Sequence, residues 1–130
     1  MARFSEKIIN FLSQVGLDVE MDVSIVPKSE SCARPGDFLF FSYRYIPQGT
    51  KRISVDVEEI FLVIQPVTKS PKTGNILLTG FKLPTDWTYT PDSLENLYNE
   101  EELPEDNYRT YVMSRMTSPL RKIRKSIEIG

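Results

Sequence analysis

Three segments decide the fold of this chain: RPGDFLFFSYRY at residues 34–45, RISVDVEEIFLVIQPV at 52–67 and NILLTGFKL at 75–83. Each has the alternating or continuously apolar pattern of a β-strand, and turn-forming residues separate one segment from the next. Three consecutive strands with this much apolar mass predict a small antiparallel β-barrel.

The first of these strands is apolar on both faces. In residues 38–45, the even-numbered positions from Phe38 share one face, and the odd-numbered positions from Leu39 share the other. A strand that buries both faces lies inside a sheet or bends across a barrel. The turn at Arg34–Asp37 is expected to start it.

A hairpin is predicted around residues 70–75, where Gly74 and Asn75 supply the left-handed backbone positions that a tight loop needs. Residues 76–81 then form the return strand. Gly80 within that strand indicates a bulge or a close approach of another backbone.

Residues 5–15 predict a short amphipathic helix. Ser5 can cap its start, and Gly16 followed by Leu17 is a typical helix end. We expect the apolar stripe to pack on the barrel; the alternative is that this helix binds a partner. The stripe consists of Ile8, Ile9, Leu12 and Val15.

Residues 19–26 alternate between apolar and polar side chains. This pattern predicts a half-buried strand at the edge of the sheet. Its apolar face consists of Val19, Met21, Val23 and Ile25.

The composition changes after Pro84. Residues 92–106 contain seven acidic residues and no Lys or Arg, whereas residues 107–127 contain six basic residues and no acid. We predict a short helix from Thr90 to about Tyr98 and a second helix starting near Pro104. The apolar positions assigned to the second helix and to the basic terminal segment after it are Tyr108, Tyr111, Val112 and Met116, then Leu120, Ile123 and Ile127.

The composition is that of one ordinary globular domain. A chain of 130 residues is long enough to form a core without disulfides or metal ions. The net charge of −2 argues against a general nucleic-acid coat protein. The apolar runs fall short of the ~18 residues of a membrane span, and residues 1–7 lack the apolar core of a signal peptide. We therefore expect an intracellular, soluble protein with no membrane partner.

The chain contains no histidine and one cysteine, Cys32. These counts exclude Ser–His and Cys–His nucleophile pairs, zinc sites that need histidine, and an intramolecular disulfide. Among the carboxylates of the second strand, Asp56 and Glu58 share the polar face and are expected to be solvated, while Glu59 points the other way. We therefore assign no catalytic, cofactor-binding or metal-binding residue.

Two features leave a nucleic-acid function open. The aromatic cluster in residues 38–45 is expected to form the core and its rim, but an aromatic strand can also stack the bases of a single strand. The basic segment at residues 115–125 can contact phosphates, or it can meet an acidic protein surface.

The core also resembles that of the mRNA-interferase toxins. The similar runs are PGDFLFF, IFLVIQP and PKTGNILL, and those toxins are SH3-like barrels. In the toxins an Arg-Pro dipeptide before the second strand serves in cleavage; here Glu58 and Glu59 stand in that place, and Thr79 matches their other active residue loosely. The resemblance implies the barrel, and we do not expect the RNase activity.

From Arg34 to Ile127 the chain is similar to small proteins of large tailed bacteriophages. The similar features are PGDFLFFSYRY, a hairpin that ends in LLTGFKLP, and YRTYVMSRMTSPLRKI. This resemblance implies a phage protein with an SH3-like core and a helical extension.

The expected fold is mainly β with helical termini, in the α+β class. It consists of a small SH3-like antiparallel β-barrel, an N-terminal helix and a C-terminal helical extension. We assign residues 1–84 to the N-terminal helix and barrel core, and residues 85–130 to a charged, partly helical extension of the same domain.

We expect a non-enzymatic structural protein of a phage virion, in the tail, baseplate or neck, with other protein subunits as partners and no cofactor. It would be assembled in the host cytoplasm; outside a virion it would be cytoplasmic. The alternative is a nucleic-acid-binding SH3-like barrel, related to the RNase toxins but without their activity. Tyr and Arg are favoured interface anchors, and the predicted partner-binding residues are Tyr108, Tyr111, Arg115, Arg121 and Arg124.

Overall fold

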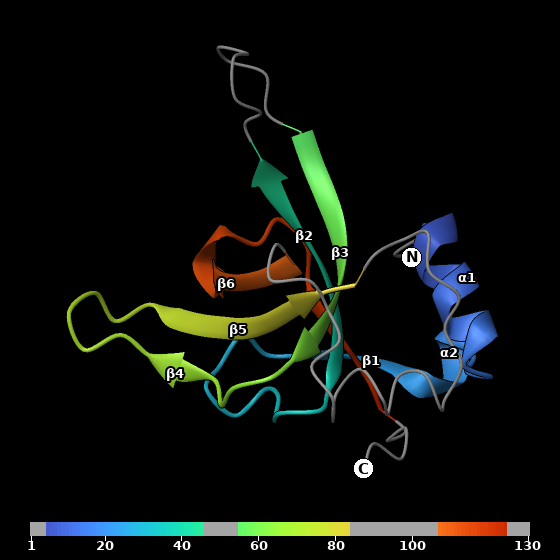
Figure 1. Ribbon diagram of the computed structural model, residues 1–130, viewed down its shortest axis with the longest axis horizontal. Helices are drawn as coiled ribbons and strands as arrows, with labels where there is room; N and C mark the ends of the chain where they lie inside the picture. The colour runs from blue at the N-terminus through green and yellow to red at the C-terminus, as the bar shows by residue number, and fades with distance from the viewer. Residues whose placement is uncertain (1–4, 46–54, 84–106, 125–130) are drawn as a thin grey trace.

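The structure, a computed structural model, describes residues 5–45, 55–83 and 107–124 (Figure 1). These residues form a seven-stranded antiparallel sheet with two helices at the N-terminal end. The elements in chain order are α1 (Glu6–Gln14), α2 (Val19–Asp22), β1 (Val23–Val26), β2 (Phe38–Tyr45), β3 (Val55–Val63), β4 (Thr68–Lys69), β5 (Ile76–Lys82), β6 (Tyr108–Val112), the 3₁₀ helix η2 (Met113–Arg115) and β7 (Leu120–Ile123).

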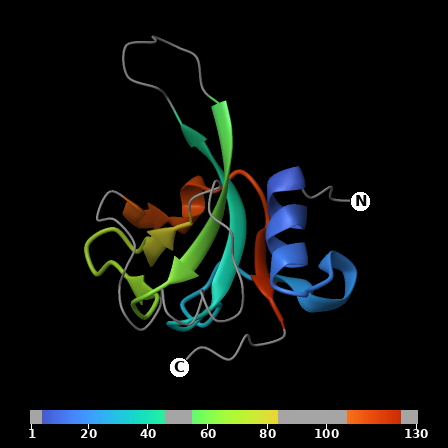
Figure 2. The same cartoon turned by 45° about the vertical axis from the view of Figure 1, so that its right-hand side comes forward.

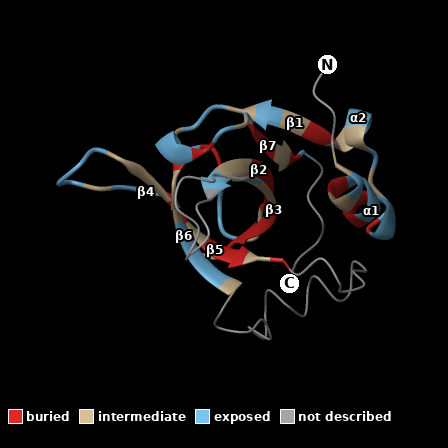
Figure 3. Ribbon diagram, turned by 90° about the horizontal axis from the view of Figure 1, so that it is seen from above, coloured by how far each residue is buried: buried red, intermediate tan, exposed pale blue. Residues whose placement is uncertain are grey.

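The strands follow the order β1-β7-β2-β3-β5-β4, and β6 pairs with β5. Seen from above, the sheet curls so that β6 comes round towards β2 (Figure 3). The chain that follows η2 connects the β6 side of the curl to β2. Met116 forms a β-bridge with Tyr43, and the Thr117 N–H donates to the Ser42 carbonyl at 2.8 Å. The mainly β, antiparallel part of the predicted fold is therefore confirmed, and the sheet curls into a half-barrel.

The central pair, β2 and β3, agrees with the sequence prediction. The two strands pair continuously from Phe38 opposite Leu62 to Tyr45 opposite Val55. The turn before β2 is tied to the end of β3, since the Gly36 N–H donates to the Val63 carbonyl at 2.7 Å. Strand β2 lies between β3 and β7, which is the interior position that its two apolar faces predict.

Strand β2 contributes to two separate hydrophobic cores. Phe38 and Phe40 pack in the outer core, which α1 covers (Figure 2). Leu39 and Phe41 pack in the inner core, inside the curl, with residues of β3, β5, η2 and β7. The predicted division of the strand into two buried faces is thus confirmed.

Helix α1 is capped and packed largely as predicted. The Ser5 hydroxyl accepts a hydrogen bond from the Ile8 N–H, and the Leu17 N–H donates to the Leu12 carbonyl beyond Gly16, which has φ +73°. One position of the predicted stripe is wrong: Ile9 is 47% exposed. Phe11 takes its place in the core, against the rings of Phe38 and Phe40. The prediction placed Ile9 on the buried face next to Ile8. Adjacent side chains on a helix point about 100° apart, so Ile9 faces solvent although Ile8 is buried.

The strand predicted for residues 19–26 is half right. Residues 19–22 form the short helix α2, because the Asp18 carboxylate caps it by accepting from the Glu20 N–H at 2.7 Å. Residues 23–26 form the edge strand β1, but its predicted buried face is not buried throughout. Met21 and Ile25 are both largely exposed.

The helix predicted after Pro104 is wrong over the described residues. Tyr108–Val112 form the edge strand β6, η2 follows, and Leu120–Ile123 form β7. The segment YRTYV is rich in aromatic and β-branched residues, and β5 offers it an unpaired edge, so sheet pairing overrides the helical spacing. The helix predicted from Thr90 to about Tyr98 lies outside the described residues.

The hairpin and Gly80 follow the sequence prediction. Strand β4 pairs with β5 across the loop, and Gly74 has φ +73°. A Cβ atom at Gly80 would overlap the carbonyl oxygen of Leu62, so the close backbone approach is confirmed.

Candidate functional site

Polar side chains gather on the inner face of the sheet near β6. They come from β2, β3, β5 and β6, and alternation along each strand turns them towards the interior of the curl. We call this group the barrel-end cluster. It consists of Tyr43, Glu59, Lys82, Arg109 and Tyr111.

The two tyrosines of the cluster belong to an aromatic group. The Tyr111 ring lies 4.9 Å from the ring of Tyr43 and 5.2 Å from that of Phe41, measured between centroids. The Tyr111 hydroxyl is buried and has no hydrogen-bond partner among the described residues. Burial raises the pKa of Tyr111, and the neighbouring Tyr43 hydroxyl and Glu59 carboxylate add to the rise. The phenol is therefore held in its neutral form.

Glu59 is the buried acid of the cluster, with 5% of its surface exposed. Burial raises the pKa of Glu59, and the positive charges of Lys7, Lys82 and Arg109 partly oppose that rise. Its neighbour Glu58 points the other way, as predicted, and accepts a hydrogen bond from the Ser5 hydroxyl at the start of α1. Glu58 and Glu59 are adjacent in sequence, but their side chains lie on opposite faces of β3 in different environments.

The shifted groups do not form an activated nucleophile. Burial raises the pKa of the Cys32 thiol, so this cysteine is less reactive than a free one. The shifts at Glu59 and Tyr111 also favour the neutral forms. Within the described ranges, no three residues of the His, Cys, Asp and Glu types come together in a way that would hold a metal ion.

An exposed surface lies on the other side of β6. Tyr108 is 37% exposed and packs edge-on against Phe81, with the ring centroids 5.4 Å apart. The Thr110 hydroxyl lies 3.0 Å from the Thr79 hydroxyl on β5. Strand β6 pairs with β5 and with no other described strand, so one of its edges offers unpaired backbone groups. We call this surface the β6 edge; it comprises residues 108–112.

The predicted partner-binding residues are distributed over two parts of the sheet. Tyr108 is exposed on the β6 edge, and Arg115 is exposed at the end of η2. Tyr111 belongs to the barrel-end cluster instead of the surface. The helical spacing put Tyr108 and Tyr111 on one face, whereas in strand β6 residues three apart lie on opposite faces, so Tyr108 is exposed and Tyr111 turns inwards.

The remaining two predicted residues belong to β7 and the chain after it. Arg121 is 7% exposed and lies between Ile25 of β1 and Phe40 of β2 in the strand register. Arg124 is exposed, and its guanidinium donates to the Val23 carbonyl at 3.4 Å. Tyr108, Arg115 and Arg124 are thus the predicted residues that are exposed, while Tyr111 is partly buried.

The aromatic residues of β2 are core residues. Phe38, Phe40 and Phe41 are each at most 2% exposed, which confirms the core interpretation. Rings buried to this degree cannot stack on bases, so the stacking platform considered for nucleic acid is wrong for these three residues.

A small cavity lies beside the β4–β5 hairpin. Its volume is about 270 Å³, slightly below the usual range of small-molecule sites. The Lys28 ammonium at its wall donates to the Met116 carbonyl at 3.3 Å. The lining residues are Lys28, Gly74, Asn75, Ile76, Met113 and Ser114.

In the part of the chain that the structure describes, no helix is both long and apolar enough to cross a bilayer.

The chain matches no protein-family model, no curated protein and no solved structure. The barrel-end cluster and the β6 edge are therefore interpreted from their own geometry.

Proposed function

We propose that this chain is a non-enzymatic interaction protein that docks onto another protein subunit through the β6 edge. The proposal rests on one observation: Tyr108–Val112 form a strand whose second edge has no strand partner among the described residues. An extended segment of a partner can add to such an edge by main-chain hydrogen bonds.

The partner segment is expected to be acidic. Arg115 is exposed beside the edge, and Arg109 of the barrel-end cluster also reaches solvent. Opposite charges across an interface increase the rate and the specificity of association. Tyr108 adds an exposed aromatic ring, which is a favoured anchor in protein interfaces.

We further propose that the curled sheet is an SH3-like barrel. Two observations support this assignment. The last part of the chain pairs first with β5, through β6, and then with β1 and β2, through β7. The 3₁₀ helix η2 interrupts it between these two pairings.

The setting that we propose is a virion of a tailed phage, where the chain joins a tail, baseplate or neck. The support is the resemblance of residues 34–127 to small phage proteins.

Mass spectrometry of salt-washed particles tests the setting. We expect the chain at a fixed ratio to the other virion proteins. Recovery only from the lysate of infected cells would contradict the virion role.

A photoreactive side chain tests the surface. In intact particles, a photoreactive residue at position 108 is expected to crosslink to one virion subunit. The same residue at Lys69, exposed on β4, is the matched control and is expected not to crosslink. Equal crosslinking from both positions would contradict docking through the β6 edge.

A further inference from the structure

Positive charge is in excess at the barrel-end cluster. Lys82 and Arg109 belong to the cluster, and Lys7 of α1 is close enough for its charge to act on the same carboxyl group, that of Glu59. Three cations thus surround one acid. The excess of positive charge persists whether or not Glu59 is ionised.

The two cations of the cluster are available to a ligand. The Lys7 ammonium donates to the Glu58 carbonyl at 2.8 Å and so holds α1 against β3. The Arg109 guanidinium donates to the Tyr108 carbonyl at 2.9 Å, which leaves most of its five N–H donors for other acceptors. The ion pairs of the described residues lie elsewhere on the sheet, so neither Lys82 nor Arg109 has a carboxylate partner among them.

The strand register brings both cations to the same face as Glu59. Lys82 lies opposite Phe61, and Glu59 precedes Phe61 by two residues on β3, so Lys82 and Glu59 are diagonal neighbours. Arg109 lies opposite Gly80, which makes it the diagonal neighbour of Lys82 on β6. Diagonal neighbours are about 7 to 8 Å apart, a separation that an ion held between two long side chains can bridge.

The site has an open side and a buried side. Arg109 is exposed and Lys82 is half-buried, whereas Glu59 is 5% exposed. Burial holds the pKa of Glu59 above its ordinary value of 4.5 in spite of the three cations. The carboxyl group therefore keeps its proton above pH 4.5, and in that form it is a hydrogen-bond donor.

We propose that the barrel-end cluster binds a tetrahedral oxyanion, a phosphate or sulfate group, between Lys82 and Arg109, with the protonated carboxyl group of Glu59 as a third donor. Hydrogen bonds from cationic donors to such oxygens are among the strongest in proteins. The three donors stand on three strands and approach from different directions, which suits tetrahedral oxygens better than a planar carboxylate. This inference goes beyond the proposed function, because it assigns a small-ion site to the inner face and leaves the β6 edge for another subunit.

Binding of the anion is coupled to the proton on Glu59. A negative charge beside a carboxyl group favours its protonated form, so the complex keeps this proton to a higher pH than the free protein does. The affinity is therefore highest at low pH and falls as the pH rises. The groups that face Glu59 are Lys7 on α1, Tyr43 on β2, Lys82 on β5, and Arg109 and Tyr111 on β6. Side chains of these other types ordinarily titrate above about pH 9, so Glu59 sets the dependence near neutral pH.

Sulfate is the first probe, because it stays divalent between pH 5.5 and pH 7.5 and any pH dependence then belongs to the protein. Amide chemical shifts in an NMR titration, at an ionic strength held constant with sodium chloride, give the dissociation constant. We expect a millimolar constant that is at least about threefold lower at pH 5.5 than at pH 7.5. The absence of saturable shifts in β5 and β6 up to about 50 mM sulfate overturns the proposal.

Three variants test the donors. Glu59→Gln is a neutral donor at every pH, so its sulfate affinity should be equal at pH 5.5 and pH 7.5. Arg109→Gln, at an exposed position that should not affect folding, is expected to bind sulfate at least about fivefold more weakly. Arg44→Gln is the matched control, since Arg44 is an exposed strand arginine outside the cluster, and it should bind like the original chain. Thermal unfolding checks that each variant folds. A folded Glu59→Gln that keeps the full pH dependence, or equal losses in the two arginine variants, contradicts the site.

Further anions test the shape and the source of the ligand. Methanesulfonate and acetate carry the same charge at pH 7.5, and we expect the tetrahedral methanesulfonate to bind more tightly. Equal or tighter binding of acetate contradicts a tetrahedral site. Glycerol phosphate and sulfate both carry about two negative charges at this pH. Tighter binding of glycerol phosphate assigns the site to the phosphate group of a larger molecule, and equal binding assigns it to the free ion.

Discussion

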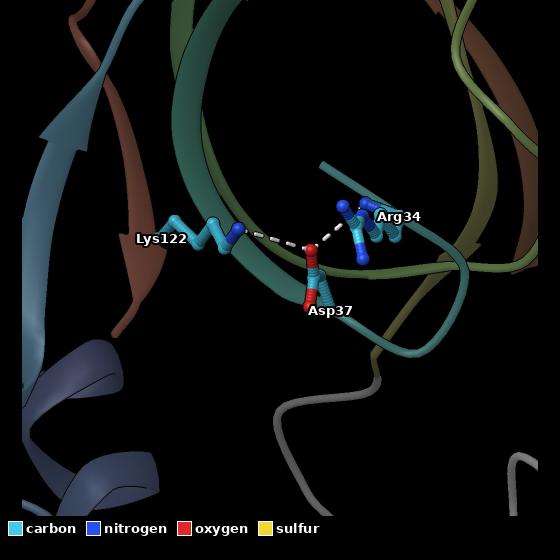
Figure 4. A network of polar contacts seen from close by, with 3 residues as sticks. All are labelled: Arg34, Asp37 and Lys122. Carbon is cyan, nitrogen blue, oxygen red and sulfur yellow. Dashed lines mark hydrogen bonds and ion pairs between the residues drawn. The ribbon is translucent and has the colours of Figure 1, made fainter. Parts of the chain in front are cut away.

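The Lys122 ammonium lies 3.2 Å from the Asp37 carboxylate and ties β7 to the turn that starts β2 (Figure 4). The same carboxylate oxygen accepts a hydrogen bond from the Arg34 N–H at 2.8 Å. One side chain thus closes the turn at residues 34–37 and holds the last described strand against it. Both side chains of the ion pair are about 70% covered, since their exposed fractions are 29% and 28%.

We predict that Asp37→Ala lowers the free energy of unfolding by about 1 to 2 kcal/mol, because it removes a charged hydrogen bond and a partly buried ion pair. Urea unfolding measures the change. Asp56→Ala is the control, since the Arg44–Asp56 pair spans 3.7 Å and is mostly exposed. We expect the control to change stability by less than about 0.5 kcal/mol. Equal losses in the two variants would contradict this role of Asp37.

Tyr111→Phe is expected to stabilise the protein. The variant keeps the ring that contacts Phe41 and Tyr43 and removes a buried hydroxyl that lacks a partner among the described residues. The gain should be about 1 kcal/mol, seen as a higher denaturation midpoint in urea. Tyr108→Phe is the control because Tyr108 is exposed, and its midpoint should barely move. A loss of stability in Tyr111→Phe would show that the hydroxyl has a favourable partner.

Glu59 is expected to make stability fall as the pH rises. The pKa of Glu59 is raised above its ordinary value of 4.5, so the folded chain binds the proton more tightly than the unfolded chain. The unfolded state therefore gains more from ionisation, and stability falls from about pH 4.5 up to the folded pKa.

The variant Glu59→Gln checks the pH dependence. It carries no ionisable group at position 59, so the fall above pH 4.5 should be smaller than in the original chain, as urea unfolding at several pH values would show. Glu58→Gln is the matched control, because Glu58 lies on the opposite face of β3, where it accepts a hydrogen bond from the Ser5 hydroxyl. An unchanged pH profile in Glu59→Gln would contradict the assignment.

Gly80→Ala should destabilise the sheet severely. The added methyl group would overlap the carbonyl oxygen of Leu62, a backbone atom that cannot move without breaking the β3–β5 pair. We expect a loss of about 3 kcal/mol in thermal or urea unfolding. Gly74→Ala should cost only about 1 kcal/mol, because its φ of +73° disfavours alanine but the space around it is open. A milder effect at Gly80 than at Gly74 would contradict the close approach.

The strands around β2 could be predicted from the sequence because their pattern is local. Residues 38–45 are apolar on both faces, and the structure buries both. The loop before β5 contains Gly74, whose left-handed backbone the sequence also indicates. These signals need no knowledge of distant residues.

The C-terminal strands could not be predicted in the same way. The apolar spacing of Tyr108, Tyr111 and Met116 fits a helix, and the edge of β5 that captures this segment is about thirty residues away in sequence. For the same reason the burial of Tyr111 and Arg121, and the gathering of Glu59 with Arg109, depend on the sheet order. That order is a tertiary property which no local pattern contains.

The two cores that share β2 have a consequence for how the chain is made and stored. Removing either α1 or the segment from β6 to β7 would leave one apolar face of β2 open to water. A nascent or clipped chain in that condition would offer a flat hydrophobic strand to its neighbours, which is the usual start of aggregation. Proteolytic cleavage that removes either of these two segments should therefore give insoluble material in place of a smaller soluble fragment.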